Sequence, residues 1–195
     1  MIDKILSLDT ELFRLINHAR SPFLDYVFAF FSAHWSIGLV LILFFIFLLR
    51  EKGTKHWYLY ILCIALCFLL ADRISVICFK DVFCRLRPSH ALDDAITVAL
   101  KHFELVYDYK GGKYGFVSSH AANTFALITS LSLVVRGSKQ ENLFFCLMLF
   151  WGVVVGYSRV YCGFHYPLDV LCGAMLGVLI GVGVYYIYKV ILKHL

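Results

Sequence analysis

Long apolar runs separated by short polar segments dominate this chain of 195 residues. Five runs reach or approach the roughly 20 residues that an α-helix needs to cross the hydrocarbon core of a bilayer. The first run is long enough to bend near His34 and Trp35 or to form two shorter pieces. The pattern predicts one all-α domain over residues 1–195, a polytopic membrane helix bundle of about five transmembrane helices, or six if the first run is divided. The runs cover about residues 23–49, 57–79, 118–136, 142–158 and 167–191.

The first 21 residues carry a different pattern, in which apolar and charged positions recur at roughly helical spacing. A helix with one apolar and one charged face lies in the interface of a bilayer. We therefore expect residues 1–21 to form an interfacial amphipathic helix, with a short soluble tail as the alternative. The apolar positions are Ile2, Ile5, Leu6, Leu12, Phe13, Leu15 and Ile16.

Composition agrees with a membrane protein. The chain is 61% hydrophobic and 16% charged, whereas average soluble domains are about 45–50% apolar and about 25% charged. The formal net charge of +5 comes mostly from basic residues at the ends of apolar runs, which is a membrane pattern. We therefore expect a membrane and a lipid as partners, and no nucleic acid.

Basic residues also indicate an orientation. Cytoplasmic connections of membrane proteins are enriched in lysine and arginine. The short connections 50–56 and 137–141 are almost purely basic, and the helix ends beside them add Lys189 and Lys193. The opposite end has as many basic residues, but some of those are candidates for chemistry. We expect the cytoplasmic (inner) membrane, with the long connection 80–117 and the turn 161–166 facing the periplasm or outside.

Ionisable side chains stand at the ends of several apolar runs. Because such groups are costly in a bilayer, they indicate a functional site. Lys80 ends the second run and His120 begins the third, while Arg159 ends the fourth and Asp169 begins the fifth. If the helices alternate in direction, these groups meet at one end of the bundle. Interfacial anchoring explains a lone lysine, but not this whole set.

Two other features of the runs are interpreted as structural. Asp72 and Arg73 lie inside the second run, where an ion pair that fixes helix packing is the alternative to a functional role. Gly173, Gly177 and Gly181 recur at a spacing of four in the last run. Small residues at this spacing allow two membrane helices to pack closely.

Three segments at the run ends form a recognisable pattern. They are Lys80-x6-Arg87-Pro88, Ser118-Ser119-His120 and Ser158-Arg159-x5-His165-x3-Asp169. Together they resemble the type-2 phosphatidic acid phosphatase (PAP2) family, whose pattern is K-x6-R-P, P-S-G-H and S-R-x5-H-x3-D. The resemblance covers about residues 60–190, and the segments occur in the family's order. It implies a membrane lipid phosphatase.

The middle segment departs from the family pattern. Val117 and Ser119 stand where the family has proline and glycine. Glycine would let the backbone approach a phosphate closely, whereas Ser119 still offers its N–H and its hydroxyl. We expect the change to affect the shape of the loop and the preferred substrate more than the chemistry.

The resemblance implies that Lys80, Arg87 and Arg159 bind the substrate phosphate. Arginine's planar fork matches two phosphate oxygens, and lysine adds a compact charge. Ser118 and Ser119 would contribute at the start of the third helix, where free N–H groups and the helix dipole favour an anion. Ser118 is also a candidate N-cap.

The resemblance further implies that His165 attacks phosphorus and forms a phosphohistidine. Asp169, four residues later, would hold the other ring nitrogen, and His120 would protonate the leaving oxygen and later activate water. No metal or other cofactor is expected, because the cations stabilise the developing charge. A zinc or iron site at His120, His165 and Asp169 is the alternative, which repulsion from the three basic side chains disfavours.

The long connection and two cysteines give further hypotheses. Residues 89–116 would form a lid over the site or, alternatively, a surface excursion with one short helix around Asp93–Leu105. Cys84 and Cys162 lie between motif residues and would form a disulfide on an oxidising face.

The sequence therefore predicts a metal-independent phosphatase acting on a membrane lipid. The family resemblance implies a substrate of the undecaprenyl diphosphate, lipid A phosphate or phosphatidate/phosphatidylglycerophosphate class. Two other functions stay open. A lipid phosphotransferase would pass the phosphoryl group to another lipid hydroxyl, and an anion or lipid transporter would use the same cations without chemistry. The two halves of the chain do not mirror each other, which counts against a transporter built from inverted repeats.

Overall fold

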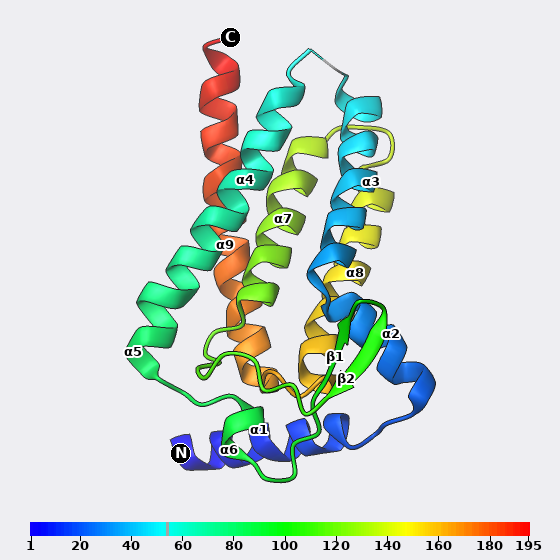
Figure 1. Cartoon of the computed structure of the whole chain (residues 1–195). Coiled ribbons are helices and arrows are strands. Elements are labelled where there is room, and N and C mark those ends of the chain that lie inside the picture. The colour runs from blue at the N-terminus through cyan, green and yellow to red at the C-terminus, as the bar shows by residue number, and fades with distance from the viewer. Residues whose placement is uncertain (54) are drawn as a thin grey trace.

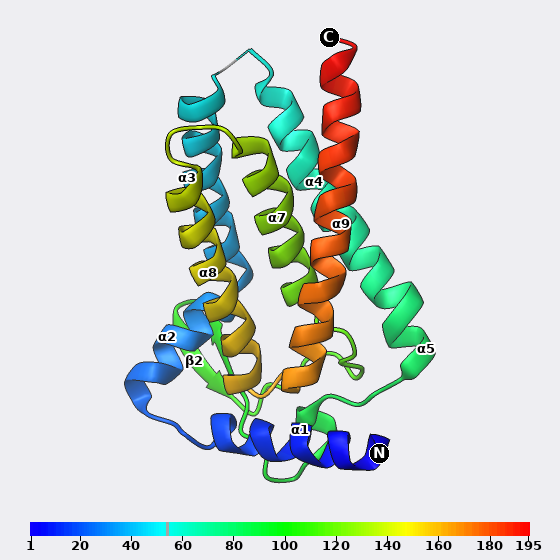
Figure 2. The same ribbon diagram turned by 180° about the vertical axis from the view of Figure 1, so that it is seen from behind.

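The computed structural model describes residues 1–53 and 55–195, and the side chains of residues 34–36 lie outside that description. The long helices run side by side as a bundle (Figure 1), and the view from behind shows the same arrangement (Figure 2). The helix α1 (Ile2–Asn17) lies across one end of the bundle, and the C-terminus lies at the other end. The bundle helices are α3 (His34–Lys52), α4 (Trp57–Ile74), α7 (Ser119–Val135), α8 (Glu141–Tyr161) and α9 (Pro167–Lys193).

Within the described residues, three helical segments are long and apolar enough to cross a membrane: Trp57–Phe83, Glu141–Tyr161 and Pro167–Lys193. The first consists of α4, a π-helical turn η1 (Ser75–Lys80) and α5 (Asp81–Phe83). Their outer faces carry large exposed apolar side chains such as Ile61, Phe150 and Leu179, which is how a surface that faces lipid tails is built. The prediction of a membrane helix bundle is confirmed.

The first apolar run is divided, as one reading of the sequence allowed. The helix α2 (Pro22–Ser32) ends at Ala33, and its axis makes an angle of 60° with the α3 segment that begins at Ile37. Eleven residues rise only about 16 Å, about half the hydrocarbon thickness, so α2 does not cross a bilayer alone. By length and composition the bent pair adds at most one span to the bundle. The side chains of His34 and Trp35, where a bend was expected, lie outside the described residues.

The helix α7 occupies the centre of the bundle and packs mainly on α9. The glycines of α9 face the α7 backbone. A methyl group added at Gly173 would lie 2.5 Å from the carbonyl oxygen of Ser118, and one at Gly181 would lie 2.5 Å from that of Ala126. The spacing of four therefore has the predicted structural role, because it lets the two backbones meet. With 17 residues, α7 is slightly shorter than a full span.

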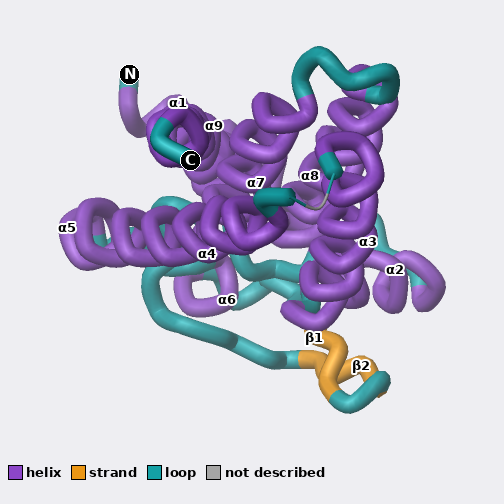
Figure 3. Tube along the Cα trace, turned by 90° about the horizontal axis from the view of Figure 1, so that it is seen from above, coloured by secondary structure: helices purple, strands orange, loops and turns teal. Residues whose placement is uncertain are grey.

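The long connection after α5 contains a β-hairpin, so the expected short helix around Asp93–Leu105 is wrong. The strands β1 (Val98–Lys101) and β2 (Glu104–Tyr107) pair antiparallel, and the short helix α6 (Pro88–Ala91) comes before them. His102 and Phe103 join the strands, both with positive φ (49° and 68°), the conformation that a two-residue hairpin turn requires. The hairpin packs on α2 and projects at one edge of the molecule (Figure 3).

The disulfide hypothesis is also wrong, because Cys84 and Cys162 are both free thiols. Cys84 is exposed at the end of α5, where its Sγ lies 3.4 Å from the carbonyl oxygen of Asp81. Cys162 is buried in a cluster with Val98, Tyr161 and Phe164. Burial raises the pKa of the Cys162 thiol to about 12.

Candidate active site

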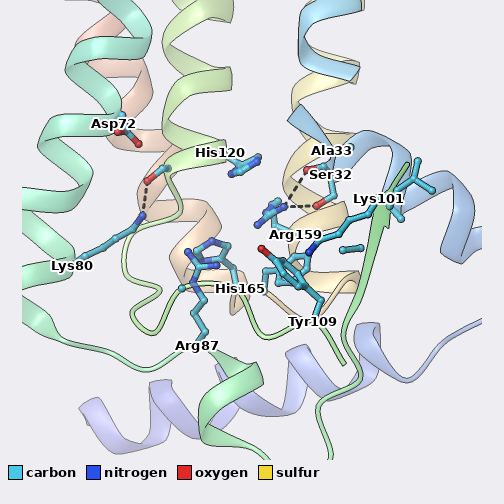
Figure 4. A pocket seen from close by; sticks show the side chains of 17 residues that line it. Ser32, Ala33, Asp72, Lys80, Arg87, Lys101, Tyr109, His120, Arg159 and His165 are labelled. Carbon is cyan, nitrogen blue, oxygen red and sulfur yellow. Dashed lines mark hydrogen bonds between the residues drawn. The ribbon is translucent and has the colours of Figure 1, made fainter. Parts of the chain in front are cut away.

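A cavity of about 450 Å³ lies at the end of the bundle near α1 (Figure 4). It collects side chains from five separate parts of the chain: the end of α2, the α4–η1 segment, the long connection, the start of α7 and the α8–α9 region. Most of the residues that the motifs singled out line it. These are Lys80, Arg87, Ser119, His120, Arg159 and His165.

Lys80 is held in this cavity by Ser119. The Lys80 ammonium donates a hydrogen bond of 2.6 Å to the Ser119 hydroxyl, which also lies 2.7 Å from the hydroxyl of Ser75. Ser75 and Lys80 are the first and last residues of the π-helical turn η1, a deformation that is frequent at functional sites. The serine that replaces the family's glycine thus supplies an oxygen that fixes the first cation of the site.

Arg159 is almost fully buried and is held from two sides. Its Nη1 donates to the backbone carbonyl of Ser32 at 3.3 Å and to the hydroxyl of the same residue. Its Cζ atom lies 4.6 Å from the ring centroid of Phe164. These contacts fix the guanidinium in the wall of the cavity that faces α2.

Arg87 is fixed through its backbone and through the root of its guanidinium. Its N–H donates to the carbonyl of Lys113 at 3.1 Å, and its Nε donates to the carbonyl of Tyr114 at 3.1 Å. A methyl group added at Gly111 would lie 3.1 Å from Arg87 Nη1. The second glycine of the pair, Gly112, also lines the cavity, so the loop backbone lies close around the guanidinium.

His165 is backed by Asp169, as the i, i+4 spacing predicted. The His165 Nδ1 atom lies 3.5 Å from Oδ2 of Asp169, and both side chains are almost completely buried. Pro167 begins α9, and the Asp169 carboxylate accepts the backbone N–H of Tyr166 at 3.1 Å, which closes the first turn. The contact is an ion-pair distance, and Nδ1 has no hydrogen-bond partner among the described residues.

The electrostatics of the cavity keep this imidazole neutral. Burial, followed by the positive charges of Arg87, Arg159 and Lys80, lowers the pKa of His165 well below its ordinary value. A neutral imidazole carries the lone pair that a nucleophile needs. A bound phosphate brings negative charge to the same cations and offsets their effect.

Ser118 does not line this cavity. It is fully buried and caps α7, where its hydroxyl accepts the backbone N–H of Ala121 at 3.4 Å. Its own N–H donates to the carbonyl of Asp169 at 2.9 Å. Ser118 therefore joins the start of α7 to the start of α9, the two helices that carry His120 and Asp169.

The long connection forms one wall of the cavity, although the sequence did not identify which residues do so. Lys101 of β1 and Tyr109 after β2 both line it, with the Lys101 ammonium 4.0 Å from the centroid of the Tyr109 ring. Tyr109 also makes an edge contact with Phe164, with the ring centroids 6.1 Å apart. The glycine pair at 111–112 was the available signal that this loop approaches another group.

Asp72 and Arg73 do not form the packing ion pair considered from the sequence, with each other or with any other described residue. Both line a second cavity of about 570 Å³, together with apolar residues such as Ile37 and Phe68. Asp72 also lines the first cavity, as do Ser119 and His120. The two cavities therefore share a wall at the start of α7.

The donor geometry does not match the zinc or iron alternative. Within residues 1–53 and 55–195, no group of three histidine, cysteine, aspartate or glutamate side chains is placed to hold a metal ion. Asp169 already accepts two hydrogen bonds, one from Arg85 and one from the N–H of Tyr166.

Comparison with known proteins agrees with the geometry. Residues 61–192 match the PAP2 superfamily. The chain is 35% identical over 189 residues to the lipid A 4'-phosphatase of Porphyromonas gingivalis, an alignment that covers 96% of this chain and 75% of that protein.

Two solved structures are also similar. LpxE from Aquifex aeolicus matches with a TM-score of 0.58 and 29% identity, over 91% of this chain and 94% of that one. The PAP2-type phosphatidylglycerolphosphate phosphatase of Bacillus subtilis matches with a TM-score of 0.68 over 98% of this chain and 88% of that one, at 20% identity, which shows the shared fold.

The family match covers more than half of the chain, and most of the motif residues line one cavity. The chain therefore belongs to the PAP2 superfamily. Within it, the protein is a membrane lipid phosphatase, a hydrolase, as the three motif segments predicted.

Proposed function

We propose that this protein removes a phosphate group from a lipid A-type substrate through a phosphohistidine at His165. The observation that carries the proposal is the buried His165–Asp169 pair, which opens onto a cavity lined by Lys80, Arg87 and Arg159. Three fixed cations around a nucleophile can stabilise the charge of a phosphoryl group during transfer. The resemblance to a lipid A 4'-phosphatase supports the choice of lipid.

In the first step, the lone pair of His165 Nε2 attacks phosphorus and forms a P–N bond. The bond between phosphorus and the ester oxygen breaks, and that oxygen takes a proton from His120 as it leaves on the lipid. The Asp169 carboxylate, with Oδ2 at 3.5 Å from Nδ1 of His165, stabilises the ring, which becomes positive as the bond forms.

In the second step, His120 removes a proton from a water molecule that attacks phosphorus. The P–N bond breaks, its electron pair returns to Nε2, and inorganic phosphate is released. His120 is then protonated and His165 is neutral, as at the start. Lys80, Arg87 and Arg159 bind the non-bridging oxygens in both steps.

The two cavities suit a lipid that carries a polar headgroup. The cavity at His165 is lined by cations and glycines, whereas the neighbouring one adds the apolar side chains of Ile37, Phe68 and Leu69 between α3, α4 and α7. We assign the headgroup phosphate to the first cavity and the start of an acyl chain to the second.

Lys101 favours a second candidate substrate, a prenyl diphosphate. Of the extra cations in the long connection, Arg85 is bonded to two carboxylates and Lys113 does not line the cavity. Lys101 does line it, and a fourth cation suits a second phosphate group. Activity on a prenyl diphosphate should therefore depend on Lys101, whereas activity on lipid A should not.

Phosphate release from a lipid panel tests the proposal. Purified protein in detergent is given lipid A, undecaprenyl diphosphate and phosphatidate, and free phosphate and phosphorylated lipid products are measured. We expect free phosphate from lipid A, no activity in His165→Ala, and retention of most lipid A activity in Lys101→Gln. A preference for undecaprenyl diphosphate that is lost in Lys101→Gln would select the second candidate.

The same assay decides between the reaction classes. Transfer of label to another lipid without free phosphate would identify a phosphotransferase. No release from any lipid, or full activity in His165→Ala, would contradict phosphatase chemistry at His165.

We also propose that the site faces the outside of the cytoplasmic membrane. The last turn of α3, with Arg50 and Lys52, and the connection with Arg136 and Lys139 lie at the end opposite to α1 and the site (Figure 1), and basic segments of this kind face the cytoplasm. In intact cells, a membrane-impermeant maleimide should label Lys110→Cys above the parent protein but should label Lys139→Cys only after lysis. The reverse pattern would place the site inside.

A further inference from the structure

The helix α1 presents polar residues to the rest of the protein. Its buried side chains are Asp9, Phe13 and Asn17, at a spacing of four, whereas Ile2, Leu8 and Leu15 are exposed. A buried carboxylate is costly unless it is paired and hydrogen-bonded. The partners of Asp9 therefore indicate why α1 lies across this end of the bundle (Figure 2).

Asp9 contacts the site region through both carboxylate oxygens. Its Oδ1 accepts the backbone N–H of Leu168 at 2.8 Å, in the first turn of α9. Its Oδ2 accepts from Nη2 of Arg85 at 2.6 Å. Asp9 is only 5% exposed, so both bonds are shielded from water.

The other terminal nitrogen of Arg85 reaches the carboxylate behind the nucleophile. Arg85 Nη1 donates to Oδ1 of Asp169 at 2.7 Å, and the Arg85 Cζ atom lies 4.1 Å from the ring centroid of Tyr166. Oδ2 of Asp169 is the oxygen that faces His165. The four side chains form a continuous series from α1 to the nucleophile, in the order Asp9, Arg85, Asp169 and His165.

We propose that Arg85 and Asp9 are positioning residues for the nucleophile, and that α1 is thereby part of the catalytic framework. The inference rests on the proposed attack by His165. Arg85 holds one oxygen of Asp169 so that the other faces Nδ1 of His165. Asp9 holds Arg85 and balances its charge, so that Asp169 keeps a full negative charge for the imidazolium that forms during attack.

The rest of α1 keeps Asp9 in place. The rings of Phe13 and Tyr166 make an edge contact with centroids 5.5 Å apart. The Asn17 amide donates to the carbonyls of Ile96 and Tyr161, at 2.8 Å each. The helix is thus fixed at three successive buried positions, which is more than an amphipathic helix needs in order to lie on a bilayer.

An exposed ion pair on the same helix provides a matched control. Arg14 pairs with Asp94 of the long connection at 2.8 Å, and both side chains are nearly half exposed. Like the Asp9–Arg85 pair, it joins α1 to the connection, but neither Arg14 nor Asp94 bonds Asp169. Exposed pairs of this kind contribute little to stability.

Steady-state kinetics of Asp9→Asn, Arg85→Gln and Arg85→Lys test the proposal, with Arg14→Gln and Asp3→Asn as controls. We expect kcat to fall by about 10- to 100-fold in Asp9→Asn and Arg85→Gln, because small displacements of a reacting group are costly. KM should change little, since neither residue lines the cavity. Arg85→Lys should recover part of kcat, and both controls should behave as wild type.

The pH profile of kcat/KM separates positioning from general destabilisation. The profile reports the protonation of His165 in the free enzyme. The charged and titratable groups around His165 are Lys80, Arg87, Arg159, His120 and Asp169. Arg85→Gln removes a positive charge next to Asp169, so the carboxylate favours the imidazolium form of His165 more strongly. The pKa of His165 then rises, and the acid limb of the kcat/KM profile moves to higher pH. Removing the negative charge in Asp9→Asn has the opposite effect, and the limb moves to lower pH.

Each outcome decides the inference. Wild-type kcat and pH profile in folded Asp9→Asn and Arg85→Gln would overturn it, as would an equal loss of kcat in Arg14→Gln. Asp9→Asn has nearly the same shape as the wild-type side chain, so it serves if Arg85→Gln does not fold, as judged by thermal unfolding. If wild type is inactive, or if His165→Ala is active, the proposed function fails instead.

Discussion

Each cation of the site is fixed by a group outside the family's motif pattern, or by one that departs from it. Ser119 accepts from Lys80, Ser32 accepts from Arg159, and the carbonyl of Tyr114 accepts from Arg87. Lys80 and Arg159 were predictable, because charged residues at the ends of apolar runs are costly without a function, whereas Arg87 was predicted from the resemblance of its segment to the family motif. Ser32 and Tyr114 were not, because their contacts join segments that only the folded chain brings together.

At the same scale, the lowered pKa of His165 gives a prediction about stability. The unfolded chain binds a proton at this residue near pH 6.5, whereas the buried imidazole in the folded protein stays neutral to a lower pH. Below about pH 6.5 the unfolded state therefore binds more protons than the folded state. The contribution of His165 to the free energy of unfolding is complete above this pH and falls below it, by at most about 1.4 kcal/mol per pH unit.

Thermal unfolding in detergent between about pH 7 and pH 5 should show this fall in wild type and a smaller one in His165→Gln. His194→Gln, which changes an exposed histidine at the other end of the molecule, should follow wild type. Equal falls in wild type and His165→Gln would mean that the folded protein protonates His165 at an ordinary pH.

At the scale of elements, the last four apolar runs predicted their helices to within a few residues, because hydropathy determines where a helix can cross a bilayer. The first run, about residues 23–49, is divided between α2 and α3. The hairpin was missed. Its strands are only four residues each. The turn between them depends on positive φ at His102 and Phe103, which the sequence pattern did not indicate, so a short helix was expected over residues 93–105. The helix α1 was predicted, but not that the face with Asp9, Phe13 and Asn17 is buried against the rest of the protein.

The packing of α7 on α9 gives a prediction at this scale. A methyl group at Gly177 would overlap the carbonyl oxygen of Ala122, whereas one at Gly183 would have nothing within 4 Å. Gly177→Ala should therefore destabilise the protein by about 1–3 kcal/mol, the usual cost of overpacking, and lower the thermal midpoint in detergent. Gly183→Ala on the same helix should leave the midpoint unchanged or raise it slightly. Equal midpoints for the two variants would show that the helices do not meet at Gly177.

At the scale of the whole molecule, the chain divides its charges between two ends. The end near α1 gathers the cations and histidines around two cavities that share a wall, and the other end carries the basic connections (Figure 1). Between them the helices present apolar side chains outward. In the proposed function, this division would let the acyl part of a lipid stay among the helices while its headgroup reaches His165.

The chemistry at His165 is tested most directly by trapping the intermediate. Wild type, His165→Ala and His120→Asn are mixed with a lipid substrate that carries labelled phosphate, quenched in alkaline detergent, and digested to locate the label. We predict label on His165 in wild type and none in His165→Ala. With a substrate whose leaving group needs no proton, His120→Asn should carry more label than wild type, because the attack of water on the phosphohistidine is slowed. Label on another residue, or continued turnover in His165→Ala, would contradict this mechanism.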